Sequence, residues 1–539
     1  MDDMGAEVMV GIGEVIAVSG SKVTGRLLEI GPGRHANAVE FGGLVKIHTT
    51  DSQVFGVVAG FWMEAGQGER PSPMMVIELL GEIPYSTDAI HGGRFQRGVC
   101  RYPRLGDPIE ETTQDDLALI YARPTASNVR FGTIRQAGGL PAFLITDSLL
   151  GKHFAVLGTT GAGKSCAVAL ILRSILGRHP NGHVIILDPH NEYGSAFPDL
   201  AELINPTNLR LPYWMMNADE LVALFVAQDG PERDAEVDIL KRAVTEARRA
   251  FAGPETDPAS ITVDTPVPFR LGDLARTLSN GMGRLTKAES SLPYLRLQGR
   301  LETLSNDARF GFLFEGLLVK DTMADVLARI LRVPVEGRPA TILDLSGVPS
   351  EIVDAVVSLI CRMAFDFVVW SAEPQAVPVL LVCEEAHRYV PEDERNSFAL
   401  ARRGIARIAK EGRKYGLSLC LVSQRPSELS ATILSQCNTI FALRLSNDRD
   451  QDFVKKAMPE GAGGLLAALP ALHNREAIVV GEGVSVPMRI TFDDLDQECR
   501  PRSGNASFAE AWEYDSFDRS FLEETIDRWR RQDRAGNGY

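Results

Sequence analysis

The sequence predicts an α/β protein whose main sheet carries a phosphate-binding loop and is preceded by a small β-rich domain. Three observations support this fold class. An apolar run at 154–157 is followed by a glycine-rich turn and then by an apolar segment of helical period. Further short apolar runs, such as 183–188 and 378–385, end in acidic residues, as strands of open α/β sheets often do at their ligand-binding edge. Before residue 80 the chain consists of short β-type runs separated by glycine.

Length and composition indicate a soluble, multi-domain protein. With 539 residues the chain is long enough for two to four domains and a large core. Its hydrophobic share of 45% and charged share of 24% are ordinary for a globular protein. The net charge of −15 argues against a generally basic nucleic-acid-binding coat. It leaves room for basic residues concentrated on one inner surface.

Nothing in the sequence points to a membrane or to secretion, so we expect a cytoplasmic protein. The N-terminal segment is acidic and lacks the basic region of a secretory signal. The longest apolar run, 355–370, is interrupted by Arg362 and Asp366 and is typical of a buried helix. The seven cysteines have no metal-ligand spacing, and Cys383 and Cys420 lie inside apolar runs, which is typical of reduced thiols.

The N-terminal region predicts a small, closed or nearly closed β-barrel between residue 7 and about residue 80. Its short β-type runs are punctuated by glycine and show few helical periods. We favour a structural cap over a ligand-binding role for it. The stretch 85–122 is expected to connect the barrel to the nucleotide-binding region, either continuing the barrel or wrapping it.

The stretch 158–165 reads GTTGAGKS, which is a complete GxxxxGK[ST] phosphate-binding loop. Glycines let the backbone turn its N–H groups toward phosphate oxygens, and the following helix N-terminus adds partial positive charge. Lys164 can reach the β- and γ-phosphates, and the Ser165 hydroxyl can bind Mg²⁺. The expected nucleotide-contacting residues are Gly158, Thr159, Thr160, Gly161, Ala162, Gly163, Lys164, Ser165 and Cys166.

The next apolar run ends in Asp188, and PHNEY follows it. An acidic residue at the carboxyl end of a parallel strand lies where α/β sheets bind ligands. Asp188 or Glu192 is therefore a candidate to face the nucleotide or a water on its metal. The alternative is that these carboxylates serve only as a helix cap or a loop acceptor.

An amphipathic helical pattern runs from about 213 to 320 and is interrupted by a Pro/Asp-rich break at 253–268. It predicts an all-helical insertion in the nucleotide-binding domain. A β-type run at 341–347 then resumes the sheet, and a helix is expected over 351–370.

The run 378–385 delivers two adjacent acids to a strand end, which is the placement of a Walker B segment. Glu384 would support Mg²⁺ through water, and Glu385 would orient and deprotonate the attacking water. Most P-loop enzymes have aspartate at the first position, so the longer Glu384 displaces the carboxylate by one methylene. The alternative is that both acids are exposed caps of the strand.

The segment 399–416 predicts a helix with one continuous basic face, since four of its basic residues follow the spacing i, i+4, i+7 and i+11. These DNA-binding candidates are Arg403, Arg407, Lys410 and Lys414. The face could contact the phosphates of DNA or of a neighbour's nucleotide, or it could simply be solvated.

The buried run 417–423 ends in Gln424-Arg425-Pro-Ser. An amide at this strand end can sense a γ-phosphate, and Arg425 can stabilise transition-state charge in its own or an adjacent subunit. The alternative is a structural turn. Arg444, in the next edge strand, is a weaker phosphate candidate.

The end of the chain predicts a hairpin over 473–492 with Gly481-Glu482-Gly483 at its turn. A charged helix over 520–532 follows. Its apolar residues, which could pack on the core or on another subunit, are Phe521, Leu522, Ile526 and Trp529.

Taken together, the chain resembles the HerA-type ATPases of the HerA/FtsK group of hexameric P-loop translocases. The resemblance rests on GTTGAGKS, LDPHNEY, LPYW, LVCEEAHRYVP, EGRKYGLSLCLVSQRPS and EAIVVGEG, which occur in the family's order over roughly 7–495. It implies a RecA-like P-loop core with a helical insertion, an N-terminal HAS-type β-barrel and a ring of six around duplex DNA. The family's functional positions fall on Lys164, Ser165, Glu384, Glu385, Gln424 and Arg425.

The resemblance leads to a domain plan and a function. The plan is a barrel at 1–85, a connecting segment at 86–135, a RecA-like core at 136–500 with its insertion at about 213–330, and a tail helix within 501–539. The expected function is an ATP- and Mg²⁺-dependent hexameric motor on double-stranded DNA, completed by Arg413 or Arg425 of a neighbour. Family members typically work beside a nuclease in DNA end processing or anti-phage defence.

Two other functions remain open from the sequence. One is an ATP-dependent scaffold ring that assembles and regulates an effector such as a nuclease, with little translocation, and the acidic net charge mildly favours it. The other is a protein-remodelling ATPase, which polypeptide rather than DNA would stimulate.

Overall fold

The computed structural model divides the chain into two compact units. The first comprises 1–179, 385–387 and 418–496, and the second comprises 180–384, 388–417 and 497–539. The residues that the structure describes are 11–28, 39–64, 71–85, 93–208, 210–227, 230–252, 256–283, 291–314, 319–371, 377–393, 398–458, 463–502, 509, 512–513 and 518–530.

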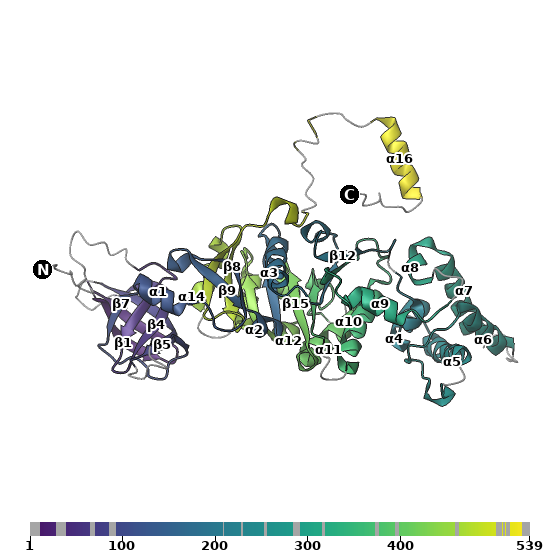
Figure 1. The fold of residues 1–539 in the computed structure, drawn as a ribbon, viewed down its shortest axis with the longest axis horizontal. Helices are drawn as coiled ribbons and strands as arrows, with labels where there is room; N and C mark the ends of the chain where they lie inside the picture. The colour runs from purple at the N-terminus through teal and green to yellow at the C-terminus, as the bar shows by residue number, and fades with distance from the viewer. Residues whose placement is uncertain are drawn as a thin grey trace. The chain divides into compact units, whose positions relative to one another are not determined.

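The first unit begins with a closed β-barrel, which confirms the expected N-terminal barrel (Figure 1). Six antiparallel strands follow one another around the ring in the order β1-β2-β5-β4-β3-β7, and β7 pairs back with β1. These strands are β1 (Gly11–Ser19), β2 (Lys22–Leu27), β3 (Leu44–His48), β4 (Ser52–Glu64), β5 (Ser72–Pro84) and β7 (Pro108–Glu111), and the short β6 (Gln96–Arg97) pairs with β5 outside the ring. The closing strand β7 comes from the segment expected to connect or continue the barrel.

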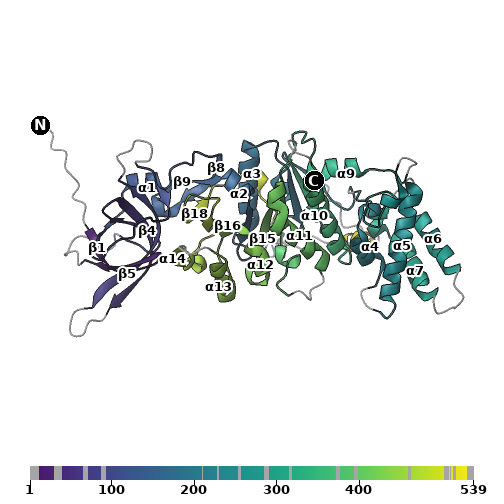
Figure 2. The same ribbon diagram turned by 90° about the horizontal axis from the view of Figure 1, so that it is seen from below.

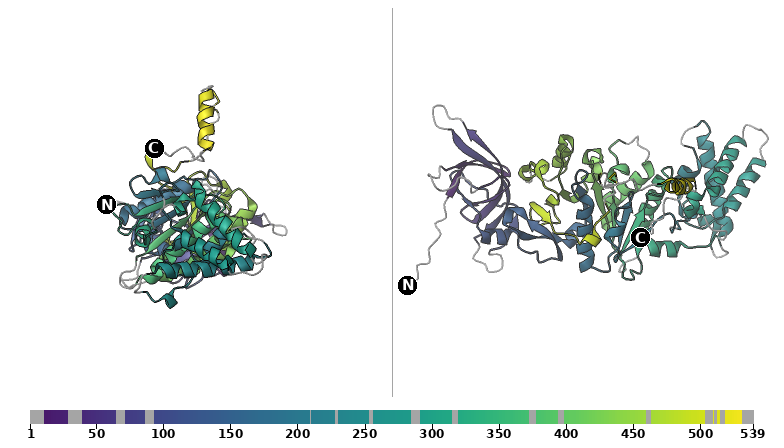
Figure 3. Two further views of the ribbon diagram at one scale, coloured as in Figure 1. Left: turned by 90° about the vertical axis from the view of Figure 1, so that its right-hand side faces the viewer. Right: turned by 90° about the horizontal axis from the view of Figure 1, so that it is seen from above.

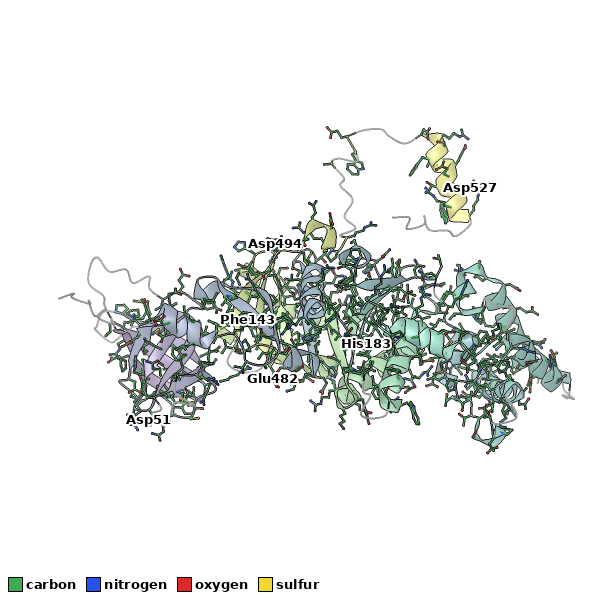
Figure 4. The ribbon with its side chains drawn as sticks, viewed as in Figure 1. Asp51, Phe143, His183, Glu482, Asp494 and Asp527 are labelled. Atoms are coloured by element: carbon green, nitrogen blue, oxygen red, sulfur yellow. The ribbon has the colours of Figure 1, made fainter. Side chains whose placement is uncertain are left out.

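Alternating side chains from every strand of the ring fill the barrel interior with aliphatic residues. They include Val15, Val23, Val45, Ile47, Val54, Val58, Met75, Ile77 and Ile109. At the barrel edge, Asp51 lies in the turn between β3 and β4 (Figure 4) and pairs with Arg101.

Helix α1 (Gln114–Ile120) is tied to the barrel by a buried ion pair. Lys46 on β3 donates from Nζ to Oδ2 of Asp116 at 3.1 Å. Burial opposes the charge on Asp116, but hydrogen bonds from Thr113 and Lys46 outweigh it and hold the pKa of this carboxyl below its ordinary value.

The first unit also contains a mixed sheet with the strand order β15-β10-β16-β17-β18-β8-β9. Strand β10 lies parallel to β15 and β16, whereas the strands from β17 outward pair antiparallel. The strands are β8 (Asn128–Ile134), β9 (Leu140–Ile145), β10 (His153–Leu157), β15 (Leu417–Ser423), β16 (Cys437–Ala442), β17 (Glu476–Gly481) and β18 (Met488–Phe492). Every residue of β10 and β15 is buried, which is typical of strands with both faces covered.

The helices of the first unit flank this sheet or link its strands. They are α2 (Thr146–Leu150), α3 (Lys164–Arg178), α12 (Ala431–Leu434), α13 (Asp448–Ala457) and α14 (Gly463–Leu466). Figure 2 shows α14 beside the barrel, and the contact is close because Glu78 of β5 accepts a hydrogen bond from Gly464 N at 2.9 Å.

The second unit is built on four parallel strands in the order β12-β13-β11-β14. They are β11 (Val184–Asp188), β12 (Ala201–Ile204), β13 (Ala340–Asp344) and β14 (Val379–Cys383). The apolar runs predicted as buried strands at 183–188, 341–347 and 378–385 are all found here. Helix α10 (Val353–Trp370) packs against α11 (Ala399–Glu411).

The predicted helical insertion lies between β12 and β13. Its helices are α4 (Ala218–Phe225), α5 (Arg233–Phe251), α6 (Leu271–Gly283), α7 (Leu292–Asn306), α8 (Gly311–Phe314) and α9 (Met323–Leu331). Helices α5, α6 and α7 lie side by side (Figures 2 and 3) and contact one another pairwise. Beyond the core, α16 (Arg519–Arg530) forms within the segment expected to carry a tail helix.

No helix among the described residues combines the length and the apolar character needed to cross a membrane.

Buried strands, their following helices and the barrel were predictable because each leaves a local pattern in the sequence. The α/β fold class with an N-terminal barrel and a helical insertion is therefore confirmed.

Candidate active site

The glycine-rich loop 158–165 connects β10 to α3, which is the structural context that a P-loop requires. Thr159 anchors the loop, because its N–H and its hydroxyl both donate to the carbonyl of Arg444, at 3.0 and 3.1 Å. Gly161 and Gly163 have φ angles of 76° and 95°, which side chains disfavour. Glycine at these two positions lets the loop turn directly into the first residue of α3, Lys164.

The P-loop lysine is folded against its own loop. Lys164 is only 7% exposed, and its Nζ donates to the carbonyl of Thr159 at 3.3 Å. The neighbouring Thr160 donates from its hydroxyl to Oε1 of Gln424. Gln424 directly follows β15, so the structure brings the predicted amide sensor into contact with the P-loop.

Glu385 adopts a strained backbone just after β14, with φ of 51°. Its side chain is largely buried, and its Oε2 lies 3.1 Å from Nδ1 of His387. The same nitrogen lies 3.3 Å from Oγ of Ser423, the last residue of β15. Glu385 is therefore a held carboxylate within the fold, and the expectation that it is merely an exposed strand cap does not fit its burial.

In the second unit, Glu384 is held by the loop that follows β11. The phenol of Tyr193 donates to Oε2 of Glu384 at 2.5 Å, and both residues are buried. Burial, and then the charge of Glu384, raises the pKa of Tyr193 well above its ordinary value. Tyr193 therefore stays a neutral hydrogen-bond donor at neutral pH.

Asp188 serves as the acceptor that shapes this loop. Its Oδ1 accepts from His190 N at 3.2 Å and its Oδ2 accepts from Tyr193 N at 2.9 Å. Burial raises the pKa of Asp188, although these N–H groups partly oppose that rise. Of the two interpretations of Asp188, the geometry favours the loop acceptor. Glu192 accepts through its carbonyl from Arg502 N at 2.9 Å.

The two arginines predicted to complete the site differ in their surroundings. Arg425 pairs with Glu428 of its own chain at 3.0 Å, and both side chains are about half exposed. Arg413 is exposed in a short 3-10 helix (Gly412–Tyr415) that ends α11, and no ion pair joins it to another residue that the structure describes. Arg444 is half-buried and supports the P-loop through its carbonyl.

The basic face of α11 is divided by its ion pairs. Arg403 pairs with Asp219 at 3.0 Å, and Arg407 lies 3.8 Å from Asp366. Arg407 also stacks its guanidinium over the ring of Phe365 at 4.1 Å.

The other two candidates of this face, Lys410 and Lys414, are exposed. Neither forms an ion pair with any other described residue. The four basic residues of this face are therefore not equivalent. The two arginines have acidic partners, and the two lysines have none among the described residues. Lys414 lies beyond the last α-helical residue, in the following 3-10 turn.

Two contacts of the acidic pair were not expected from the sequence. Tyr193 and His387 belong to the motifs LDPHNEY and CEEAH, which by themselves assign neither residue a role. The signal was their position, since each follows a strand-end acid within five residues. Only the fold shows which acid each residue contacts.

Comparison with known proteins finds similarity to HerA helicases. The family model described as "Helicase HerA, central domain" matches residues 129–364. The DNA double-strand break repair helicase HerA of Pyrococcus furiosus is 26% identical over 468 residues, which cover 82% of this chain and 81% of that protein. The protein of the same name from Sulfolobus acidocaldarius is 25% identical over 405 residues, covering 73% and 74% of the two chains.

Solved structures with a similar chain path include two proteins. VirB4 of Thermoanaerobacter pseudethanolicus aligns with a TM-score of 0.48 at 18% identity, over 69% of this chain and 98% of that one. The bacterial conjugative coupling protein TrwB aligns with a TM-score of 0.45 at 15% identity, over 71% and 93%.

A P-loop between a buried strand and a helix, with a glutamate pair at the end of another buried strand, defines a P-loop ATPase that uses a nucleotide cofactor. The motifs, the matched central domain and the long relatives indicate one group within this class. The chain is a P-loop ATPase that resembles the HerA-type ATPases over most of its length.

Proposed function

We propose that the chain is an ATP-driven translocase of duplex DNA that works as a ring, with six subunits as the expected number. One observation carries the proposal: the P-loop, the end of β15 and the Glu385 carboxylate are linked by side-chain contacts. Thr160 bonds to Gln424, and Ser423 lies against His387, which in turn lies against Glu385. Such a linkage suits a site that hydrolyses ATP and reports the event to the rest of the subunit.

Within this site the P-loop binds the nucleotide. The N–H groups of 158–165 and the N-terminus of α3 hold phosphate oxygens, and Lys164 leaves the Thr159 carbonyl to reach the β- and γ-phosphates. Ser165 and Glu384 supply hard oxygen ligands, which suit Mg²⁺ bound directly or through water. The metal, when bound, neutralises charge on the phosphates. Tyr193 holds Glu384 in place for this role.

Hydrolysis is assigned to Glu385 and Gln424. Glu385 orients the attacking water and takes its proton, and its buried position favours a fixed direction of attack. Gln424 accepts from the Thr160 hydroxyl in this structure and turns toward the γ-phosphate when ATP is bound. A single arginine then stabilises the charge that develops on the transferred group.

A neighbouring subunit supplies this arginine in our proposal. Arg413 is the better candidate of the two, because it is exposed and forms no ion pair with the described part of the chain. Arg425 is already paired with Glu428. An arginine in trans makes hydrolysis depend on assembly, as a motor with coordinated subunits requires.

The DNA substrate is inferred from the relatives, whose names describe DNA repair helicases. The exposed Lys410 and Lys414 would track backbone phosphates without reading bases, with Arg403 and Arg407 beside them as secondary contacts. A companion nuclease, in DNA end processing or anti-phage defence, is the effector we propose for the ring.

The test compares ATP hydrolysis by the full chain with and without duplex DNA. We expect stimulation by duplex DNA and salt-sensitive DNA binding. Lys164→Ala should abolish hydrolysis and weaken ATP binding. Glu385→Gln should bind ATP normally but lower kcat by about 10²- to 10⁴-fold, the usual contribution of a general base. His473→Ala, at an exposed position, is the matched control and should keep wild-type kcat.

The same assay separates the rival function. A scaffold ring that only assembles an effector predicts hydrolysis that duplex DNA does not change. That outcome, together with DNA binding that salt does not weaken, would remove the motor from the proposal. Normal turnover by Glu385→Gln would instead remove the proposed role of Glu385.

A further inference from the structure

His387 lies between Glu385 and the end of β15, and the proposed hydrolytic mechanism leaves it without a role. We propose that Nδ1 of His387 is a single hydrogen-bonding position for which Glu385 and Ser423 compete, and that this competition positions the Glu385 carboxylate. His387 is thus a positioning residue. The inference deepens the proposed function, since it rests on Glu385 acting as the general base.

The geometry places both competitors on one atom. Oγ of Ser423 is hydrogen-bonded to Nδ1 at 3.3 Å, and Oε2 of Glu385 lies 3.1 Å from the same Nδ1 as an ion-pair neighbour outside hydrogen-bond geometry, so this structure corresponds to the state in which Ser423 occupies Nδ1. Ser423 is fully buried, and Oε2 of Glu385 is shielded from solvent. Bulk water therefore does not readily take the place of either partner.

One ring nitrogen carries either a proton or a lone pair, so it cannot serve both partners fully. With a proton on Nδ1, the imidazole donates best to the Glu385 carboxylate, because charged acceptors make the stronger bonds. With a lone pair on Nδ1, it accepts from the Ser423 hydroxyl and offers no donor to Glu385. Glu385 is held in the first state and released toward water in the second.

The held and released states differ in what Glu385 can do. A carboxylate oxygen that accepts a hydrogen bond from Nδ1 is directed at His387. Release lets the carboxylate of Glu385 turn toward the attacking water. Its backbone φ of 51° lies in a region that side chains disfavour, so surrounding contacts, not backbone preference, set where the carboxylate points.

Ser423 connects this switch to the nucleotide. Its Oγ accepts from Arg425 N at 3.1 Å, which leaves its own proton to donate to His387. Gln424 lies between Ser423 and Arg425 in the chain, and its side chain accepts a hydrogen bond from Thr160 of the P-loop. A change at Gln424 when the γ-phosphate arrives therefore moves the residues on both sides of it, and with them the Ser423 hydroxyl.

The test uses the full chain with saturating duplex DNA and compares His387→Ala, His387→Asn, Ser423→Ala and the double variant His387→Ala/Ser423→Ala. We expect His387→Ala to lower kcat by about 10- to 100-fold with KM for ATP within about twofold, because Glu385 then lacks the held state that aims its carboxylate before each release. Asparagine places an amide near the position of Nδ1, so His387→Asn should recover part of kcat. Ser423→Ala should lower kcat at unchanged KM.

The double variant decides whether the two residues act on one another. If they share one nitrogen, the double variant should be no slower than His387→Ala alone, because the Ser423 partner is already gone. If the loss of kcat in the double variant equals the product of the two single losses, the two residues act independently and the proposed competition is wrong. Should His387→Ala fail to fold, His387→Phe, which keeps a ring but has no ring nitrogen, and its combination with Ser423→Ala apply the same criterion.

Two further variants separate the possible failures. If Glu385→Gln is inactive while His387→Ala and Ser423→Ala keep wild-type kcat, the positioning role is wrong and the proposed function stands. If Glu385→Gln hydrolyses ATP normally, the general base itself is wrong and the inference falls with it. His473→Ala controls for the loss of a histidine elsewhere in the same unit.

Discussion

Adjacent residues at a strand end have different surroundings in this site. Glu384 is held by the phenol of Tyr193, whereas Glu385 lies against the imidazole of His387. A buried phenol is a fixed donor, while an imidazole exchanges between donor and acceptor near neutral pH. This difference matches the two roles proposed for the pair: a constant metal support and a base that must be released.

The contact of Tyr193 leads to a prediction about metal use. Tyr193→Phe removes only the hydroxyl that holds Glu384, so the Mg²⁺ concentration needed for half-maximal hydrolysis should rise about 10-fold or more. A titration of ATPase activity with Mg²⁺ measures this. Tyr389→Phe is a matched control, because the buried Tyr389 hydroxyl has no hydrogen-bond partner among the described residues. Equal Mg²⁺ curves for both variants would contradict the support role.

Glu476, at the start of β17, predicts an acid-sensitive contribution to stability. It is 3% exposed and lies 2.7 Å from Arg489 and 3.2 Å from Arg135. Burial alone would raise the pKa of Glu476, but the hydrogen bond and charge of Arg489, with His473 N and Arg135, hold it below the ordinary value. The ionised form is therefore bound more favourably in the folded state than in the unfolded state.

The lowered pKa of Glu476 determines how the free energy of unfolding depends on pH. The stabilisation is present above the unfolded-state pKa of about 4.5 and is lost as the pH falls through the lower, folded-state pKa. Glu476→Gln should lower the free energy of unfolding by about 3 kcal/mol at pH 7. The gap between variant and wild type should shrink in acid. Thermal melts from pH 7 to pH 3 test this, and a gap that widens in acid would refute it.

At the scale of elements, the helical insertion depends on one buried cation. Arg248 on α5 is fully buried and donates to the carbonyls of Trp214 and Met216, at 2.9 and 2.8 Å, and to the carbonyl of Val263. Burial lowers the pKa of Arg248 to about 10, which still leaves it charged at neutral pH. The planar guanidinium of Arg248 thus links the LPYW segment and the 261–265 loop to α5.

Replacing the Arg248 guanidinium should lower the stability of the helical insertion without affecting the P-loop. Arg248→Lys keeps the charge but cannot reach three carbonyls in a plane, so we expect a loss of about 2 to 4 kcal/mol. Hydrogen exchange should speed up in α5 and around 213–216 while α3 stays protected. Arg242→Lys, on the exposed side of the same helix, is the control. Faster exchange in α3 as well would show that the insertion does not respond as a separate element.

Helix α11 gives a prediction about DNA contacts. All four basic residues of this face are exposed, but Arg403 and Arg407 have acidic neighbours within the subunit, whereas Lys410 and Lys414 form no ion pair with another described residue. Lys410→Ala/Lys414→Ala should therefore weaken DNA binding and reduce its salt slope by about 2, since each phosphate that is no longer neutralised lowers the slope by about 0.9. Arg403→Ala/Arg407→Ala should change the slope less. An unchanged slope in both double variants would leave this face as a solvated surface.

At the scale of the whole molecule, the proposal requires more than one subunit for each active site. The chain carries a net charge of −15, so under the proposed function attraction to DNA comes from local surfaces such as α11 rather than from the overall charge. A shared site also explains why an exposed arginine, Arg413, lies in a chain whose own P-loop is already supported by Gln424 and Thr159.

Mixing two inactive variants tests the shared site. Lys164→Ala lacks the P-loop lysine and Arg413→Ala lacks the proposed trans arginine, so each alone should be inactive. In mixed rings an intact P-loop meets an intact Arg413 at some interfaces, and hydrolysis should return to a fraction of the wild-type rate. The particle mass with and without ATP and duplex DNA gives the number of subunits. No recovery in rings shown to be mixed would assign Arg413 to its own site or to none.

The sequence alone determined the parts of this protein that have local signatures. The buried strands, the P-loop with its two left-handed glycines, the helical insertion and the barrel each follow from periodicity, turn residues or a short motif. Such features are predictable because a run of neighbouring residues specifies its own backbone conformation and burial.

Only the tertiary structure decided which distant residues meet. Tyr193 contacts Glu384 across 191 positions, and Thr160 contacts Gln424 across 264. Acidic residues from α4 and α10 occupy half of the basic face predicted for α11. These outcomes depend on how separate elements pack, and no local pattern records that packing. The P-loop was therefore evident from the chain itself, while the partners of its two glutamates required the fold.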